Sequence, residues 1–208
     1  MIITIGDLCY RFPNLLEQWT SRIYGVLRDE SELVRSNALS VISHLILNDM
    51  IRVKGQISYL VVLLEDPSKH IQGLARVFFM EWGKRGSNPV YNVLPECISS
   101  LLEMSEVDYE KFTRLIKFLL RFVDKEKQQD QLVDKLLQRF QFTTDPYKWK
   151  CLAFCLSALP ITSNTCEKYL LHRRYLKDPL HNREVYEIVE QIITKVRLWI
   201  DLVWLMGS

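Results

Sequence analysis

The chain has 208 residues, of which 48% are hydrophobic and 25% charged, values typical of a folded globular protein. A total of 27 Lys and Arg against 25 Asp and Glu leaves a net charge of +2, which excludes a global basic field of the kind that binds nucleic acid. Seven Gly and seven Pro disfavour a turn-rich β fold, and five irregularly spaced cysteines do not form a secreted disulfide framework. We expect a soluble, intracellular protein without a signal peptide or a membrane-spanning segment.

Apolar residues recur at helical spacing along nearly the whole chain. A first helix is expected to end near Arg11, and a second to begin around Pro13, since proline suits a first helical turn. Further helices are expected over 33–46, 54–64, from 67, 89–102, 109–123, 130–140 and 147–159, and after a cap cluster at 162–164. The clearest loop is 83–89, which contains two glycines and a proline.

Two aspartates are expected to cap helices. Asp29, with Glu32 three residues later, has the form of an N-cap and capping box. Asp66 is expected to cap the next helix of this kind, with Pro67 at its first position.

The chain also contains an internal repeat with an offset of 37 residues. The first copy is Leu27-Arg28-Asp29, Val34-Arg35 and Ala38, and the second is Leu64-Glu65-Asp66, Ile71 and Ala75-Arg76. A period of this length indicates a helical solenoid, in which each helix pair buries its apolar face against the next pair. The two alanines are expected where helices approach closely. Beyond Val123 the repeat spacing is no longer evident.

The copy pattern resembles the HEAT repeat, and longer strings resemble the conserved C-terminal region of the condensin subunit 1 family, HEAT-repeat regulatory subunits of condensin I. The strings are Gly6-Asp7-Leu8, Arg11-Phe12-Pro13-Asn14-Leu15, Ser43-His44-Leu45-Ile46-Leu47, Asp49-Met50, Val53-Lys54-Gly55 and Tyr91-Asn92-Val93-Leu94-Pro95. Weaker similarity continues to about Leu159. The family's proteins are several times longer, and residues 197–208 do not resemble them, so a truncated form is expected.

The resemblance implies an all-α fold, an α-α superhelix of the HEAT/armadillo-like solenoid type with about five helix pairs. The solenoid is expected over 1–160, followed at 161–208 by further helices with a divergent apolar tail. The resemblance also implies a non-enzymatic part in mitotic chromosome condensation, through binding of kleisin and SMC subunits and contact with the DNA backbone. The expected location is the nucleus or chromosome, and the cytoplasm in part of the cell cycle.

Two alternatives stay open. The chain could be a generic HEAT or armadillo adaptor, such as a transport receptor or phosphatase scaffold, although that consensus does not require Phe12-Pro13-Asn14 or Val53-Lys54-Gly55. It could also be a truncated copy without independent function.

The sequence contains no motif that indicates catalysis. A glycine-rich phosphate loop, Gly-x-Ser-x-Gly and His-Glu-x-x-His do not occur, so we expect no enzyme, cofactor or small-molecule substrate. A zinc site would need Cys151, Cys155, Cys166 and His172, but their spacing fits no finger pattern well. Cys151 and Cys155 lie one helical turn apart in an apolar segment, so core packing is favoured.

The candidate DNA-binding or partner-binding residues are basic. Arg35 and Arg76 are interpreted as equivalent repeat positions that face one side of the solenoid. The other candidates near the turns are Arg52, Lys54, Lys84 and Arg85. Such residues neutralise backbone phosphates without reading bases. The alternative interpretation is a structural Asp–Arg ladder between stacked repeats, formed with Asp29 and Asp66.

Overall fold

The structure is a computed structural model that describes residues 19–51, 53 and 56–206, together with Thr4, Leu8 and Arg11. At Thr20 and beyond residue 198 it describes the backbone only. The described residues form ten α-helices and no strand, so the prediction of an all-α helical-repeat fold is confirmed. The predicted helix start at Pro13 lies outside the described residues.

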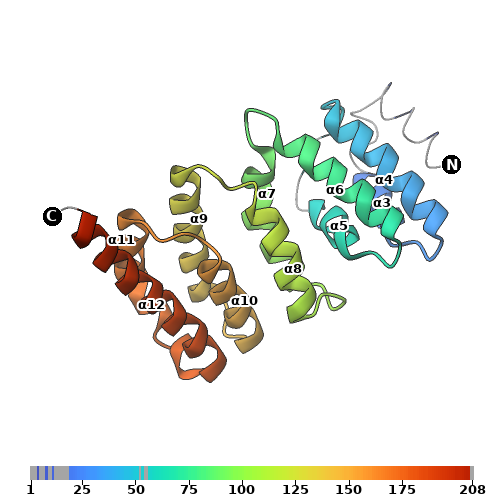
Figure 1. Ribbon diagram of the computed structural model, residues 1–208. Coiled ribbons are helices and arrows are strands. Elements are labelled where there is room, and N and C mark those ends of the chain that lie inside the picture. The colour runs from blue at the N-terminus through green and yellow to red at the C-terminus, as the bar shows by residue number, and fades with distance from the viewer. Residues whose placement is uncertain are drawn as a thin grey trace. The chain divides into compact units, whose positions relative to one another are not determined.

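The chain divides into two compact units, Met1–Val107 and Asp108–Ser208. The first contains α3 (Thr20–Gly25), α4 (Glu32–Leu47), α5 (Ile57–Val62), α6 (Lys69–Gly83) and α7 (Pro89–Leu102) (Figure 1). The second contains α8 (Tyr109–Leu120), α9 (Glu126–Arg139), α10 (Pro146–Ser157), α11 (Ser163–His172) and α12 (Arg183–Met206). The predicted boundary at residue 160 stays a prediction. None of the described helices combines the length and apolar character needed to cross a bilayer.

In the first unit, α4 and α6 lie side by side and run in the same direction (Figure 1). Their starts are joined by a contact between Arg35 and Asp66, and their ends by one between Asp49 and Arg85. Ala38 and Ala75 are fully buried, as close approach of helices requires. The repeated sequence of this unit is therefore expressed as two stacked, parallel helices.

In the second unit, the 37-residue period persists in the positions where helices begin. The starts of α8, α10 and α12 are Tyr109, Pro146 and Arg183, each 37 residues after the last. The starts of α9 and α11, Glu126 and Ser163, are also 37 residues apart. The expectation that the spacing is lost beyond Val123 is therefore wrong for the positions of the helices. The identities of the apolar residues change from one copy to the next, but the helices still begin 37 residues apart.

The signal for this hidden period is a polar cap. Asp108, Asp145 and Asn182 are spaced by 37 residues, and each precedes the first residue of its helix. The Asp108 carboxylate accepts the backbone N–H of Lys111 at 2.7 Å, and that of Asp145 accepts the N–H of Tyr147 at 2.9 Å. Asn182 accepts two N–H groups at the start of α12, at 3.0 and 3.2 Å. These caps satisfy donors that the first turn leaves without a helical partner.

The predicted caps of α4 and α6 are wrong by two residues. The N-cap positions are Ser31 and Ser68, neither of which makes a side-chain cap hydrogen bond. Asp29 and Asp66 instead accept the backbone N–H of these serines, at 2.9 and 2.8 Å, in turns that precede the helices. The cap cluster expected at 162–164 is confirmed, since Thr162 forms a reciprocal capping box with Thr165.

A second device recurs at four helix starts. The side chain at the fourth helical position donates to the backbone carbonyl six residues earlier, before the helix begins. The pairs are Arg35 with Asp29 (2.9 Å), Gln72 with Asp66 (2.7 Å), Gln129 with Val123 (2.9 Å) and Trp149 with Thr143 (2.9 Å). Each bond satisfies a carbonyl that the turn would otherwise leave without a partner.

Candidate functional site

Arg35 lies in a structural joint between the two repeat copies. Its Nε and Nη2 donate to the two carboxylate oxygens of Asp66, at 2.9 and 3.0 Å. Its Nη1 donates to the carbonyls of Asp29 and Glu30, both at 2.9 Å. The side chains of Arg35 and Asp66 are only 13% and 4% exposed, and their hydrogen bond raises the pKa of the guanidinium. Arg35 thus forms the Asp–Arg contact that the sequence offered as the alternative to DNA binding.

Arg76 is not the counterpart of Arg35, so that interpretation is wrong. The residue 37 positions after Arg35 is Gln72, and both occupy the fourth position of their helices. Gln72 donates to the carbonyl of Asp66 as Arg35 donates to that of Asp29. The offset alone could have identified Gln72, because the alanines Ala38 and Ala75 already define the register.

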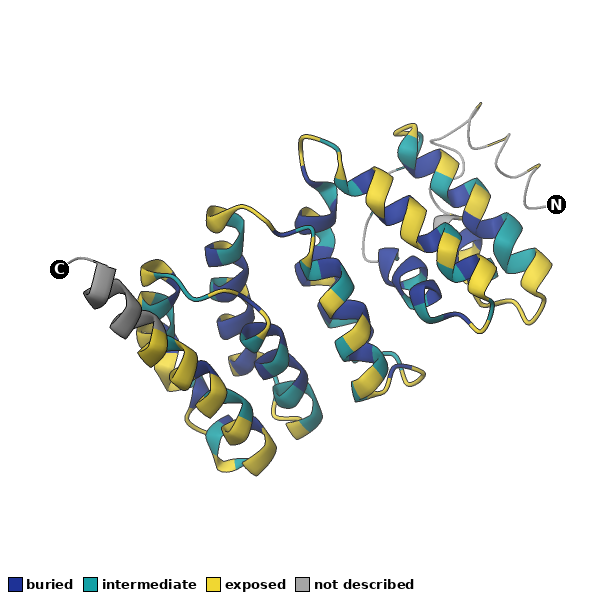
Figure 2. Ribbon diagram, in the orientation of Figure 1, coloured by how far each residue is buried: buried dark blue, intermediate teal, exposed yellow. Residues whose placement is uncertain are grey.

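Arg76 belongs instead to an exposed surface of α6. We call this surface the α6 face: Lys69, Gly73, Arg76, Val77, Met80 and Lys84. Figure 2 shows the exposed residues of α6 along one side of the helix. Val77 and Met80 are 59% and 52% exposed, and in the sequence they lie between Arg76 and Lys84. The face therefore combines positive charge with apolar surface.

The loop after α6 separates the two neighbouring cations Lys84 and Arg85. Lys84 forms an exposed ion pair with Glu81 at 2.6 Å. Arg85 turns to the end of α4, where its guanidinium donates to the carboxylate of Asp49 at 2.6 Å and to the carbonyl of Leu47. Arg85 therefore tethers the loop to α4, whereas Lys84 stays on the α6 face.

The remaining candidates do not join this set in the described structure. Arg52 and Lys54 lie outside the described residues. Arg28 forms an ion pair with Glu106 and stacks over the ring of Tyr59, with its Cζ 4.4 Å from the ring centroid. Of the six predicted site residues, the α6 face thus brings together Arg76 and Lys84. Sequence reasoning missed the exposed Val77 and Met80, which interrupt the hydrophilic side of the helix.

Two of the three cysteines that are candidate zinc ligands pack in the core, and the third, Cys166, is half-buried. Cys151 and Cys155 are fully buried in α10, and burial raises the pKa of the Cys151 thiol to about 12 and that of Cys155 further. His172 contacts the carboxylate of Asp134 at 2.8 Å, and Cys166 lies on α11. In the part of the chain that the structure describes, no three potential ligands lie close enough to hold a metal ion.

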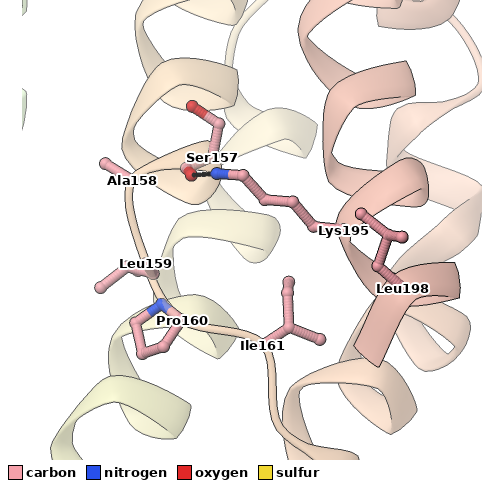
Figure 3. Close-up of a pocket in the computed structure, with 7 residues that line it drawn as sticks. All are labelled: Ser157, Ala158, Leu159, Pro160, Ile161, Lys195 and Leu198. Atoms are coloured by element: carbon pink, nitrogen blue, oxygen red, sulfur yellow. Dashed lines mark hydrogen bonds between the residues drawn. The ribbon is translucent and has the colours of Figure 1, made fainter. Parts of the chain in front are cut away.

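A shallow pocket of about 550 Å³ lies between the end of α10 and the C-terminal half of α12. Figure 3 shows Lys195 reaching across it to donate to the carbonyl of Ser157, at 2.7 Å. The lining residues are Ser157, Ala158, Leu159, Pro160, Ile161, Lys195 and Leu198. Lys195 is the one ionisable group in this lining, so the pocket offers no acid–base pair or activated nucleophile.

Comparison with known proteins identifies the family. Residues 1–157 match the family described as non-SMC mitotic condensation complex subunit 1. The chain belongs to this family. It is 41% identical over 193 residues to "Condensin-1 complex subunit CAP-D2" of Arabidopsis thaliana. The aligned region covers 93% of this chain and 14% of that protein.

Other relatives show the same relationship. The chain is 40% identical over 198 residues to "Condensin complex subunit 1" of Mus musculus, covering 95% of this chain and 14% of the relative. The yeast protein of the same name, from Saccharomyces cerevisiae, is 34% identical over 159 residues, 76% of this chain and 13% of the relative. The predicted resemblance is confirmed, and similarity extends past Leu159. The chain spans about one seventh of these relatives' length.

Proposed function

We propose that this chain is a non-catalytic scaffold segment of a condensin-like complex, which acts in mitotic chromosome condensation by binding kleisin and SMC subunits. The observation that carries the proposal is the family match over residues 1–157. The stacked helices support it physically, because a helical-repeat fold presents extended surfaces for partners. The expected location is the nucleus and chromosome, with the cytoplasm in part of the cell cycle.

The α6 face is the proposed contact surface for a partner or for DNA backbone. Lys69, Arg76 and Lys84 lie along α6 and its C-cap, and the 15 positions from Lys69 to Lys84 span about 22 Å along the axis. This length corresponds to about six base pairs of duplex, so the three cations suit phosphates spaced about three base pairs apart. Val77 and Met80 add apolar area that suits a protein partner better than DNA.

The first test is a pulldown of the tagged chain from mitotic nuclear extract, with bound proteins identified by mass spectrometry. Recovery of kleisin and SMC subunits would support the proposal. A Val77→Ser, Met80→Ser variant is expected to reduce that recovery, while an Ala substitution of the exposed Gln141, in the second unit, is the matched control. Recovery of chaperones alone would favour the alternative of a truncated copy without independent function.

DNA contact is tested separately by the salt dependence of binding to a duplex of random sequence. The slope of log K against log salt is negative, and replacing Lys69 and Lys84 with alanine is expected to reduce its magnitude by about 2. Each lost phosphate contact removes roughly 0.9. Alanines at the exposed Lys125 and Lys127 of the second unit are the charge-matched control. Equal slopes for the two double variants would show that Lys69 and Lys84 of the α6 face do not contact DNA.

A further inference from the structure

The loop between α6 and α7 presents an exposed serine. Ser87 is exposed and follows Gly86, where an added side chain would meet nothing within 4 Å. Within the described structure, the Ser87 hydroxyl makes no hydrogen bond, although its backbone carbonyl accepts one from Asn92 at 3.1 Å. Asn88, the next residue, caps α7 with its side chain. The hydroxyl therefore stands free at the point where the chain leaves the loop and enters a helix.

Two cations precede this serine in sequence. Lys84 and Arg85 lie three and two positions before Ser87, and no other serine or threonine of the chain has basic residues at both positions. Serine/threonine kinases choose substrates largely by charge patterns around the acceptor, and an acidic substrate groove selects this arrangement. The loop is also short and exposed, as a segment must be if an active-site cleft is to enclose it.

Ser31 is the nearest competitor within the chain. It is exposed and has Arg28 three positions earlier, but Asp29 and Glu30 intervene. Both acidic residues oppose binding to an acidic groove. Ser31 and Ser87 are both exposed but differ in the charges that precede them, so comparing their phosphorylation tests the effect of charge alone.

We propose that Ser87 is a phosphorylation site for a serine/threonine kinase that selects basic residues before the acceptor, with ATP as phosphoryl donor. The Ser87 Oγ forms a bond to the γ-phosphorus while the bond to the β–γ bridging oxygen breaks. ADP leaves, and the hydroxyl proton passes to the general base of the kinase. This site does not depend on the proposed condensin role, because purified chain, kinase and ATP suffice to examine it.

The surroundings accommodate the product. A phosphoserine carries about −1.5 to −2 charges at neutral pH. At Ser87 that charge would lie directly before the N-cap of α7, whose first-turn N–H groups and helix dipole favour an anion. Lys84, an exposed cation, lies three positions before Ser87, whereas the Arg85 guanidinium is held by Asp49. The cation that helps to recruit the kinase therefore also favours the phosphate that the kinase leaves.

The experiment incubates the full chain with ATP and the catalytic subunit of cyclic-AMP-dependent protein kinase, which prefers basic residues before the acceptor. Cleavage after glutamate releases residues 82–96, a peptide that contains Ser87 as its one hydroxyl-bearing serine or threonine. We expect an added phosphate on this peptide, and none in Ser87→Ala. The Ser31→Ala variant is expected to incorporate phosphate at the unchanged rate.

Charge selection is tested with Lys84. Lys84→Ala is expected to lower the initial rate of phosphorylation at least fivefold, and Lys84→Arg to restore it. Because Lys84 is exposed and its ion pair is with Glu81, this change leaves the tether between Arg85 and Asp49 intact. Circular dichroism confirms that each variant is folded. An unmodified 82–96 peptide, equal labelling of Ser31 and Ser87, or a rate unaffected by Lys84→Ala would overturn the proposal.

Discussion

The joint between α4 and α6 in the first unit and the joint between α9 and α11 in the second solve the same problem with different chemistry. In both pairs the second helix begins 37 residues after the first. In the first unit, Arg35 on the earlier helix binds Asp66 before the later one. In the second unit, the carboxylate is on the earlier helix: Asp130 accepts from Thr162 Oγ1 at 3.1 Å and from Asn164 Nδ2 at 3.0 Å.

The comparison teaches that the spacing of a repeat outlasts its residues. The donor and the acceptor have exchanged sides, and a charged donor has been replaced by two neutral ones. A search for identical residues therefore finds the first pair and misses the second. What both pairs retain is a buried carboxylate, since Asp66 and Asp130 are 6% and 8% exposed, held at the start of the later helix.

Removing the carboxylate is the strongest test of this comparison. Asp66→Ala leaves the poorly exposed guanidinium of Arg35 without its partner, so unfolding free energy should fall by roughly 3 kcal/mol. Asp130→Ala removes bonds from neutral donors, and the loss should be about 1–2 kcal/mol. Urea denaturation followed by circular dichroism measures both. Equal losses would show that donor charge does not distinguish the two joints.

The close approach of α4 to its neighbours gives the next prediction. Ala38 is fully buried, so Ala38→Leu should overpack the first unit and lower stability by about 1–3 kcal/mol. Ser40, on the same helix, is exposed, and Ser40→Ala is the control, with a change within about 0.5 kcal/mol. Identical melting curves for Ala38→Leu and the wild-type chain would contradict the tight packing at this layer.

The caps of the second unit should each contribute a smaller amount. Asp145→Ala removes the acceptor for the Tyr147 N–H and should cost about 1 kcal/mol, as should Asp108→Ala at the start of α8. Asp124 is exposed, and Asp124→Ala is the matched control in the same unit. Thermal denaturation resolves the difference. If the control lost as much as the two cap variants, overall charge rather than capping would explain the effect.

The smallest effect is expected from the side chains that reach back to the preceding turn. Gln72→Ala in the first unit and Gln129→Ala in the second each remove one partly buried hydrogen bond to a carbonyl, worth about 0.5–1 kcal/mol. The two losses should agree, because the geometry is the same in both units. Gln141→Ala, at an exposed position, provides the baseline. A stability loss for only one of the two glutamine variants would show that this hydrogen bond does not contribute equally in the two units.

Sequence reasoning located most helices and the family, but it placed the site incompletely. Helical periodicity predicted α4, α6, α7 and α10 to within a few residues, because each buries a continuous apolar stripe. It could not tell that Arg35 is used internally and that Arg85 binds Asp49, since both partners lie more than 30 residues away in sequence. The presence of a positive charge did not reveal whether an arginine binds an acidic residue within the fold, as Arg35 and Arg85 do, or lies on the α6 face, as Arg76 does.

The sequence by itself determined the all-α class, the 37-residue period of the first unit and the family, because local propensity and spacing are written in consecutive residues. Three evenly spaced caps of the second unit, Asp108, Asp145 and Asn182, were also present in the sequence, although no repeated apolar residues marked them. Only the tertiary structure decided which cations hold the repeats together and which remain on the α6 face. That choice depends on the partners that stacking brings within hydrogen-bond distance, and no single segment encodes them.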